Sequence, residues 1–354
     1  MNRRQMLRLL AGSAAAATLA ACGASTATSP TAMPAATAAD ATAMPAATAM
    51  PAATAATAAP LTTGSADAGS FAGAPDMKGK LSLKKISMAF IPAEDAAKTL
   101  SDNKDLLAYM KQVFDVEVVG AVGTSYSAVI EAMRAKKVDV AFYGPFSYIL
   151  AHVEANAQAL VQGENKDGKQ SNYFSLIITQ ADSDIKTLAD IKGRSFSFVD
   201  AASTSGHLVP SYTLLKKVGL SEKDYKPLYA GSHPASYQAV LNKKVDAGAI
   251  ASDIFQKGID EGSIDAKAIR IVDTSFSIPG SPIAVRGDIP QADQDMLLQA
   301  FLAINEQPKE SKLWKVVSGG LGVGTVKLRK ADDAVYDELR NIPEAIGIDI
   351  KKLK

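Results

Sequence analysis

The sequence predicts an α/β fold of two lobes, and three observations lead to this prediction. From residue 85 onward, short apolar runs alternate with amphipathic stretches, a pattern typical of parallel strands covered by helices. A strand–loop–helix–strand module occurs twice. The series of elements changes near residues 180–185 and returns near 275–283, so we expect the second lobe to be inserted into the first through two hinge strands.

The individual elements follow from local periodicity, because alternating or continuous apolar runs predict strands and apolar residues at helical spacing predict helices. The predicted strands are 86–91, 116–119, 138–142, 159–162, 173–179, 195–199, 245–249, 269–272 and 283–285, and the predicted helices are 101–114, 127–136, 146–155, 208–218, 237–241 and 291–305. We assign residues 79–180 and 280–354 to lobe 1 and residues 181–279 to lobe 2.

The first 21 residues resemble a secretory signal. Arg3 and Arg4 precede an apolar run at 9–21, which is shorter than the roughly 20 residues that a membrane-spanning helix needs. Residues 2–7 resemble a twin-arginine signal, but paired arginines also open ordinary signals, so the export route stays open. We predict that residues 1–21 are a lipoprotein signal peptide and that the protein is extracytoplasmic.

Cys22 is the only cysteine, so no intramolecular disulfide can form. It follows Leu-Ala-Ala and precedes Gly23, which is the pattern of a lipidation site, although a chance cysteine is the alternative. Residues 22–78 are mostly Ala, Thr, Pro, Ser and Gly, and the run 31–37 recurs at 42–48. Such a stretch buries too little apolar surface to offset its chain entropy. We therefore predict a lipid anchor at Cys22 followed by a linker.

The charge balance excludes a nucleic-acid partner. Removal of residues 1–21 takes away three arginines and changes the formal net charge from +1 to −2, and the sequence shows no basic stripe. Any anion site must therefore be local.

The repeated module places two polar loops at equivalent positions. Residues 123–126 (Gly-Thr-Ser-Tyr) lead into a helix that ends in Lys-Lys-Val-Asp at 136–139, and residues 231–233 (Gly-Ser-His) lead into one that ends in the same four residues at 243–246. Loops at the carboxyl ends of parallel strands are where open α/β sheets bind ligands. Two generic βαβ units with coincidental charges are the alternative.

The segment 200–207 contains the most specific candidate site. Ser203, Thr204 and Ser205 precede Gly206 at a predicted helix start, where hydroxyls, backbone N–H groups and the helix dipole favour an anion. An ordinary helix cap is the alternative. We expect His233, in the matching loop, to donate a ring hydrogen bond to the anion, with protonation adding charge.

Three tyrosines fall at strand ends or helix starts. Tyr126, Tyr143 and Tyr173 are further candidate ligand-binding residues, and packing with a surface hydroxyl is the alternative for each, above all for Tyr143.

Taken together, residues 126–134, 138–144, 203–206, 231–233 and 278–282 resemble the phosphate/phosphite/phosphonate-binding proteins of ABC transporters, over nearly all of residues 85–321. The resemblance implies a type II periplasmic-binding-protein fold and ABC permease subunits as partners. It also implies that the Ser-Thr-Ser hydroxyls and amides, His233, Tyr126 and Tyr173 hold the phosphorus oxygens.

One departure bears on the ligand. Family members that bind aminoethylphosphonate place two acids near the amine; Asp253 matches the first, and Ser281 occupies the second position. Because burying an incompletely paired cation is costly, we expect an amine-free ligand such as phosphite or methylphosphonate. Asp253 is a candidate to accept a proton-bearing ligand oxygen, or alternatively to cap the helix that follows it.

Other function classes find less support. The three histidines show no metal-site spacing, and Ser205 lacks a nominated base, so we expect no catalytic residue, no metal and no cofactor. We expect a monomeric binding protein. A receptor for phosphate or another oxyanion, a phosphoester-processing enzyme and an adhesion scaffold are the alternatives.

Overall fold

The computed structural model describes residues 61–65 and 71–350. The predicted signal peptide, the lipidation site Cys22 and most of the predicted linker lie outside these residues. Among the helices in the described part of the chain, none combines the length and the apolar character that crossing a membrane requires.

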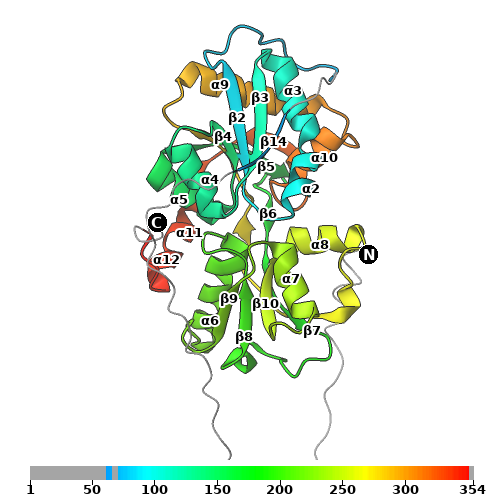
Figure 1. Cartoon of the computed structure of the whole chain (residues 1–354), viewed down its shortest axis with the longest axis vertical. Coiled ribbons are helices and arrows are strands. Elements are labelled where there is room, and N and C mark those ends of the chain that lie inside the picture. Colours follow the sequence, from blue (N-terminus) through cyan, green and yellow to red (C-terminus); the bar gives the residue numbers. More distant parts are fainter. Residues whose placement is uncertain (1–60, 66–70, 351–354) are drawn as a thin grey trace, which may run out of the picture. The chain divides into compact units, whose positions relative to one another are not determined.

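Lobe 1 is built on a seven-stranded sheet (Figure 1). Its strand order is β1-β3-β2-β4-β13-β5-β14, with β2 parallel to both β3 and β4, and β13 antiparallel to β4 and β5. The strands are β1 (Thr62–Ser65), β2 (Lys85–Phe90), β3 (Glu117–Val122), β4 (Val140–Phe142), β5 (Ala157–Asn165), β13 (Ile283–Arg286) and β14 (Thr325–Lys330). The helices are α2 (Ala96–Asp102), α3 (Lys104–Phe114), α4 (Tyr126–Arg134), α5 (Pro145–Ala155), α9 (Gln291–Ala303) and α10 (Lys312–Gly319).

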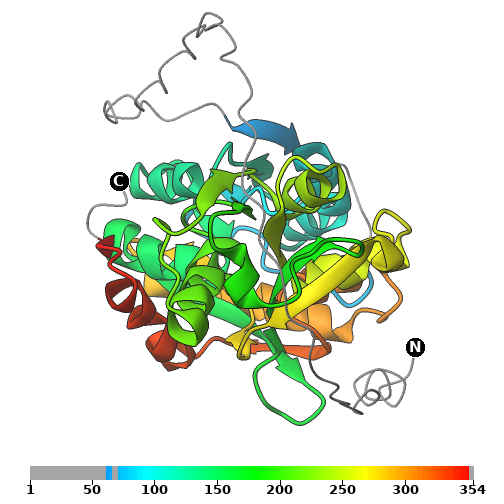
Figure 2. The ribbon, with the colours of Figure 1, turned by 90° about the horizontal axis from the view of Figure 1, so that it is seen from below.

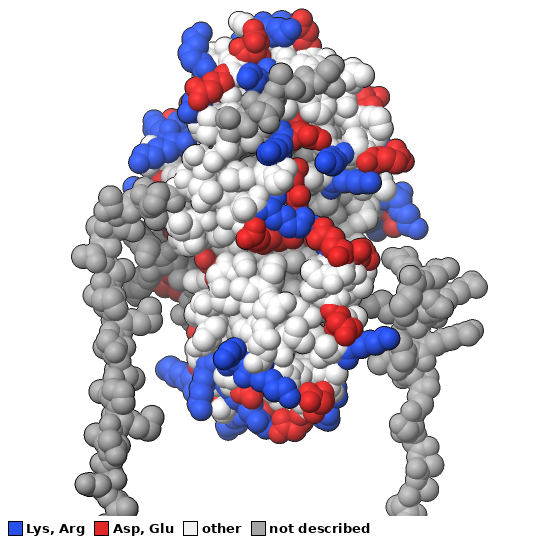
Figure 3. Space-filling model, turned by 45° about the vertical axis from the view of Figure 1, so that its right-hand side comes forward, with Lys and Arg blue, Asp and Glu red and all other residues white. Residues whose placement is uncertain are grey.

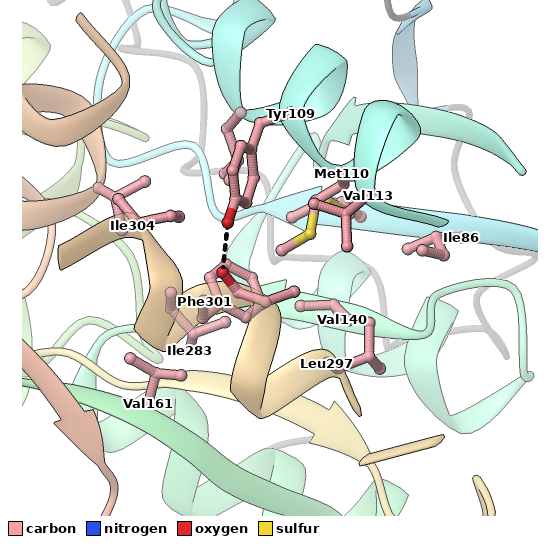
Figure 4. Close-up of a cluster of buried hydrophobic side chains, with 14 of the residues drawn as sticks. Ile86, Tyr109, Met110, Val113, Val140, Val161, Ile283, Leu297, Phe301 and Ile304 are labelled. Carbon is pink, nitrogen blue, oxygen red and sulfur yellow. Dashed lines mark hydrogen bonds between the residues drawn. The ribbon is translucent and has the colours of Figure 1, made fainter. Parts of the chain in front are cut away.

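A buried cluster between α3, α9 and the sheet forms one core of this lobe (Figure 4). Tyr109 on α3 is fully buried, and its hydroxyl donates a hydrogen bond of 2.8 Å to the Ala300 carbonyl on α9. Phe301 packs beside it, together with Val140 and Ile283 from the sheet. The apolar face of α3 that the sequence predicted therefore points into the core.

Lobe 2 has a five-stranded sheet of order β11-β7-β10-β8-β9, in which β8 pairs in parallel with β9 and β10. The strands are β7 (Ser175–Gln180), β8 (Ser195–Phe198), β9 (Lys226–Tyr229), β10 (Ala247–Ala251) and β11 (Ile269–Thr274). The helices are η1 (Leu188–Ile191), the π-helix η2 (Thr204–Leu208), α6 (Val209–Val218), α7 (His233–Leu241), α8 (Ser252–Asp260) and η3 (Ala266–Ala268).

The chain crosses between the lobes at two short strands that pair with each other, β6 (Asn172–Tyr173) and β12 (Ile278–Pro279). The expected boundary at residue 180 lies too late, because β7 belongs to the sheet of lobe 2. The run 173–179 reads as one strand in the sequence, but Phe174 interrupts it. Its amide and carbonyl bond to Ser252 instead of to a sheet partner.

Lobe 1 also begins earlier than the expected residue 79. Strand β1 lies within the predicted linker and pairs antiparallel with the edge of β3. The Gln112 side chain holds the Phe71 backbone by two hydrogen bonds, of 2.8 and 3.0 Å, and Met77 is buried. Low sequence complexity therefore did not exclude these residues from the folded lobe.

The C-terminal part of the chain contacts both lobes. Helices α11 (Asp337–Arg340) and α12 (Ile342–Ala345), red in Figures 1 and 2, lie beside α5 of lobe 1 and α6 of lobe 2 respectively. Tyr336 shares a buried cluster with Leu208 from lobe 2. Between α9 and α11 lie two short 3-10 helices, η4 (Ile304–Glu306) and η5 (Asp333–Tyr336).

Gly280, directly after β12, has no room for a side chain. A Cβ atom there would lie 2.0 Å from the Leu321 carbonyl oxygen and 2.7 Å from that of Ser171. We expect Gly280→Ala to lower the free energy of unfolding by about 1–3 kcal/mol, the usual cost of overpacking. Gly319→Ala is the matched control, because its Cβ would meet no atom within 4 Å. Urea unfolding of both variants checks this, and equal stability of the two would contradict it.

Candidate functional site

The two repeated modules begin alike. Ser125 caps α4 by accepting a hydrogen bond from the Ala128 amide at 3.1 Å, and Ser232 caps α7 by accepting one from the Ala235 amide at 3.3 Å. The next residues, Tyr126 and His233, therefore occupy the same first helical position in lobe 1 and lobe 2.

The modules also end alike. Lys136 and Lys243 both have left-handed backbone, with φ of 59° and 56°. Asp139 then accepts the Ser87 amide at 2.8 Å, and Asp246 accepts the Ser195 amide at 2.8 Å. The first lysine of each repeated Lys-Lys-Val-Asp sequence thus turns the chain, and its aspartate ties the returning strand to the parallel neighbour. The repeat therefore has a structural role.

The hydroxyl-rich loop after β8 has the geometry of an anion cradle. Ser203 caps the π-helix by accepting the Gly206 amide at 3.0 Å. The N–H groups of Thr204 and Ser205 precede the first intrahelical bond and lie at the positive end of the helix. Gly206 is required here, because a Cβ would lie 2.4 Å from Val199. Short π-helical turns are frequent at functional sites.

This loop lies where the lobes meet. The Thr204 hydroxyl accepts a 2.8 Å hydrogen bond from the Phe146 amide at the start of α5 in lobe 1. The Tyr126 amide of lobe 1 donates to Asp200 at 3.2 Å. Ser203, Thr204 and Ser205 are each at most 2% exposed. Their polar groups are therefore screened from solvent, in the way that a closed binding cleft requires.

Tyr126 and Tyr173 approach the loop from two other elements. Burial raises the pKa of Tyr126, as does Asp200, while a hydrogen bond with Ser203 opposes the rise. Burial also raises the pKa of Tyr173, against hydrogen bonds with Thr204 and Ser205. Both phenols therefore stay protonated and can donate to a ligand.

The structure does not bring Tyr143 to this group. Its buried hydroxyl lies 3.4 Å from the Val129 carbonyl and 3.8 Å from Sδ of Met133, both on α4. Tyr143 is therefore a packing residue, but its hydroxyl is buried and does not lie at the surface as the packing alternative expected.

His233 is present as a neutral donor. The Ala251 amide donates a 3.1 Å hydrogen bond to Nδ1, which puts the proton of the neutral ring on Nε2. Burial lowers the pKa of His233 to about 3. The expectation that protonation adds charge is therefore wrong, since the ring is fully desolvated. The His233 amide also donates to the Ala93 carbonyl of lobe 1 at 3.0 Å.

His207 holds the hydroxyl-rich loop in place through hydrogen bonds of its ring, a role that the sequence did not suggest. Its Nδ1 lies 2.8 Å from the Ala201 carbonyl, and its Nε2 lies 2.7 Å from Glu222 and 3.0 Å from the Tyr229 hydroxyl. The hydrogen bond with His207 lowers the pKa of Glu222. His207 lies four residues after Ser203 in the same loop, and this position is the signal that could have revealed its role.

Asp253 is the second residue of α8, and its Oδ1 accepts the Ile254 amide at 3.0 Å. Burial raises the pKa of this carboxyl to about 6; Glu94 adds to the rise and Lys257 opposes it. The adjacent Ser252 bonds to the backbone next to Tyr173. The charge of Asp253 also raises the pKa of Tyr126 and Tyr173, so this carboxylate is the acidic group near the two phenols.

Charged side chains from both lobes meet at the edge of the junction (Figure 3). Lys257 of α8 pairs with Glu94 of lobe 1 at 2.8 Å, and Lys98 of α2 pairs with Glu261 of lobe 2 at 3.4 Å. Asp102 contacts both lysines, at 2.7 Å from Lys98 and 3.7 Å from Lys257. We call these five residues the rim cluster.

The arrangement is suited to binding an anion. It combines helix N-termini, hydroxyls and an imidazole N–H, which are all donors. Among residues 61–65 and 71–350, no group of three or more His, Cys, Asp or Glu side chains could hold a metal ion.

Comparison with known proteins decides the family. Residues 88–336 match the family described as "ABC transporter, phosphonate, periplasmic substrate-binding protein". The chain belongs to this family. It is 27% identical to the phosphonates-binding periplasmic protein of Escherichia coli, over 75% of this chain and 80% of the relative. It is 32% identical to the phosphate-import protein PhnD of Mycolicibacterium smegmatis, over 61% and 70% of the two chains.

Solved structures confirm the type II periplasmic-binding-protein fold. A binding protein of an ABC phosphonate transporter from Pseudomonas aeruginosa gives a TM-score of 0.66 at 25% identity, covering 74% of this chain and 86% of that one. PhnD1 from Prochlorococcus marinus, solved with methylphosphonate, gives 0.64 at 20% identity, covering 74% and 98%. The protein is thus an extracytoplasmic substrate-binding component of an ABC transporter of the phosphonate family, a family of transport proteins and not of enzymes.

The neutral His233 predicts a pH dependence of stability. The unfolded ring takes up a proton below its ordinary pKa of 6.5, whereas the folded ring does so only near 3. The contribution of the neutral His233 ring to the free energy of unfolding is therefore complete above pH 6.5 and is lost as the pH falls toward 3. Between pH 7 and pH 5 the free energy of unfolding should fall by about 2 kcal/mol. Urea unfolding at both values should show a smaller loss for His233→Asn than for the wild type. Equal losses would argue against a neutral buried ring.

Proposed function

We propose that this chain captures a small phosphorus oxyanion between its lobes and delivers it to an ABC permease. The observation that carries the proposal is that Tyr126 and Tyr173 hydrogen-bond to the hydroxyls of Ser203, Thr204 and Ser205. His233 is tied to the end of β10, the strand that packs against this loop. All six supply donors, and a tetrahedral anion accepts hydrogen bonds in every direction.

We infer that the ligand lacks an amine and is phosphite, methylphosphonate or a comparable phosphonate. Three relatives are named for binding or importing phosphonates, phosphate and phosphite, and these ligands all contain a tetrahedral phosphorus group. Asp253 is an acid beside this site, and the hinge position that carries a second acid in aminoethylphosphonate binders is Ser281 here. Glu94, the other carboxylate near Asp253, is already paired with Lys257. An enclosed ammonium would therefore be short of a counter-charge.

Removal of single hydroxyl groups provides a matched test of the site. We expect Tyr173→Phe and Ser205→Ala each to weaken methylphosphonate or phosphite binding by about 1–3 kcal/mol, because each leaves a charged partner short of a hydrogen bond. Tyr143→Phe is the control, since its hydroxyl contacts only α4. Calorimetric titration measures all three affinities. Loss of affinity in the control, or none in Tyr173→Phe and Ser205→Ala, would contradict this site.

We also propose that the mature chain is a monomer held at the outer face of the membrane by a lipid on Cys22. The support is the Leu-Ala-Ala-Cys sequence after the apolar run and the absence of another cysteine in the chain.

Cys22→Ser should release the protein from the membrane fraction, because the thiol that carries the lipid is missing. Fractionation of cells that express the wild type and the variant checks this expectation, with ligand binding of the soluble variant as the control for folding. Retention of Cys22→Ser in the membrane fraction would exclude the anchor.

A further inference from the structure

The ring of His207 closes the hydroxyl-rich loop on itself. Its Nδ1 lies 2.8 Å from the carbonyl oxygen of Ala201, six residues earlier in the chain. Ser203, Thr204 and Ser205 lie between these two bonded residues. Because a carbonyl oxygen can only accept, Nδ1 carries a proton whether the ring is charged or neutral. The position of the ring therefore bears directly on the three hydroxyl residues.

Titratable groups face the His207 ring from three segments: Glu222 after α6, Tyr229 on β9 and Asp200 after β8. Nε2 lies 2.7 Å from Glu222 and 3.0 Å from the Tyr229 hydroxyl. A protonated ring donates from Nε2 to Glu222 and forms an ion pair. A neutral ring accepts at Nε2 from Tyr229, whose hydroxyl keeps its proton because burial raises the pKa of this tyrosine. The proton on Nε2 thus decides which partner the ring takes.

The ion pair between His207 and Glu222 is asymmetric in its burial. The side chain of His207 is 4% exposed, whereas that of Glu222 is 41% exposed. Water therefore screens the carboxylate more than the imidazolium. The short contact to Glu222 offsets part of the cost of burying the charge of the ring. A protonated His207 thus adds a positive potential behind the loop that Glu222 does not fully cancel.

Asp200 gives the loop a use for such a charge. Burial raises the pKa of its carboxyl, while the amides of Ala202 and Tyr126 and the charge of His207 oppose the rise. The two amides donate to the Asp200 carboxylate at 2.8 and 3.2 Å. An ionised carboxylate three residues before Ser203 disfavours an anion at the loop, and hydrogen bonds from amides leave its charge in place. A protonated His207 compensates this charge, whereas a neutral one does not.

We propose that His207 is a positioning residue for anion capture, and that its protonated form, paired with Glu222, binds the oxyanion more tightly than its neutral form. This inference rests on the proposed function and adds a dependence on pH to the same site. His233 does not supply it, since its buried ring stays neutral. Ordinary imidazoles gain a proton below about pH 6.5, so capture should strengthen in mildly acidic surroundings.

An NMR titration of the wild-type histidine rings tests the coupling directly. If the protonated ring favours the ligand, saturating methylphosphonate must in turn favour the protonated ring, because linkage is reciprocal. The midpoint of the His207 titration should therefore rise by about one pH unit, which corresponds to a tenfold difference in affinity. His152 is the internal control: its Nδ1 also lies 2.8 Å from a carbonyl, that of Ala157 in lobe 1, and its midpoint should not move.

Variants give an independent readout by calorimetry. His207→Asn keeps a donor for the Ala201 carbonyl but cannot become charged, so the ratio of wild-type to variant affinity should be about tenfold larger at pH 5.5 than at pH 8. The titration of methylphosphonate itself cancels in this ratio. His152→Asn is the matched control and should give the same ratio at both pH values. Glu222→Gln, at a partly exposed position, should move the midpoint of the affinity profile to lower pH by about one unit.

The outcomes are separable. An unmoved His207 midpoint, or an affinity ratio for His207→Asn that does not change with pH, would overturn the role of His207 while leaving oxyanion binding intact. If His207→Asn does not fold, the wild-type titration and Glu222→Gln decide, and an unshifted profile in Glu222→Gln would overturn the pairing. Failure of the wild type to bind any phosphorus oxyanion would overturn the proposed function and this inference together.

Discussion

The hydrogen bond from the Ala251 amide to Nδ1 of His233 is the interaction on which the candidate site depends. It joins the end of β10 to the start of α7 and thereby fixes the ring in the first turn of the helix. It also decides the tautomer, because a nitrogen that accepts cannot carry the proton of a neutral imidazole. The opposite nitrogen is then left as a donor, and burial keeps the ring uncharged.

A site made of neutral donors solves a particular electrostatic problem. Enclosing an anion requires replacement of its hydration shell, and a buried lysine or arginine would itself have to be desolvated. Hydroxyls, amides and a neutral imidazole are less costly to bury and still point their dipoles at the ligand. Duplication of the serine-capped helix start places Tyr126 and His233 at the same helical position in the two lobes. Under the proposed function, the ligand would therefore bond to both lobes.

The sequence predicted the parts of the molecule that depend on local pattern. The strands near β2, β8 and β10 and the cap at Ser203 follow from apolar periodicity and side-chain chemistry, and the family resemblance supplied the order of the loops. Features that depend on tertiary contacts were less accessible. The break at Phe174 needs Ser252, the neutral state of His233 needs burial, and Tyr143 turned out to face α4 although it follows a strand as a site residue would. Strand β1 was hidden by a composition that reads as a linker.

The rim cluster lies outside the neutral donors, so two kinds of force act on the lobes. Its partly exposed ion pairs are individually weak and are screened by salt, whereas the buried hydrogen bonds at the hydroxyl loop are not. If the lobes close over a ligand as proposed, a higher ionic strength weakens the ion pairs that hold them together and leaves the donors that contact the ligand unchanged. Under the proposed function, residence time and selectivity would then change independently.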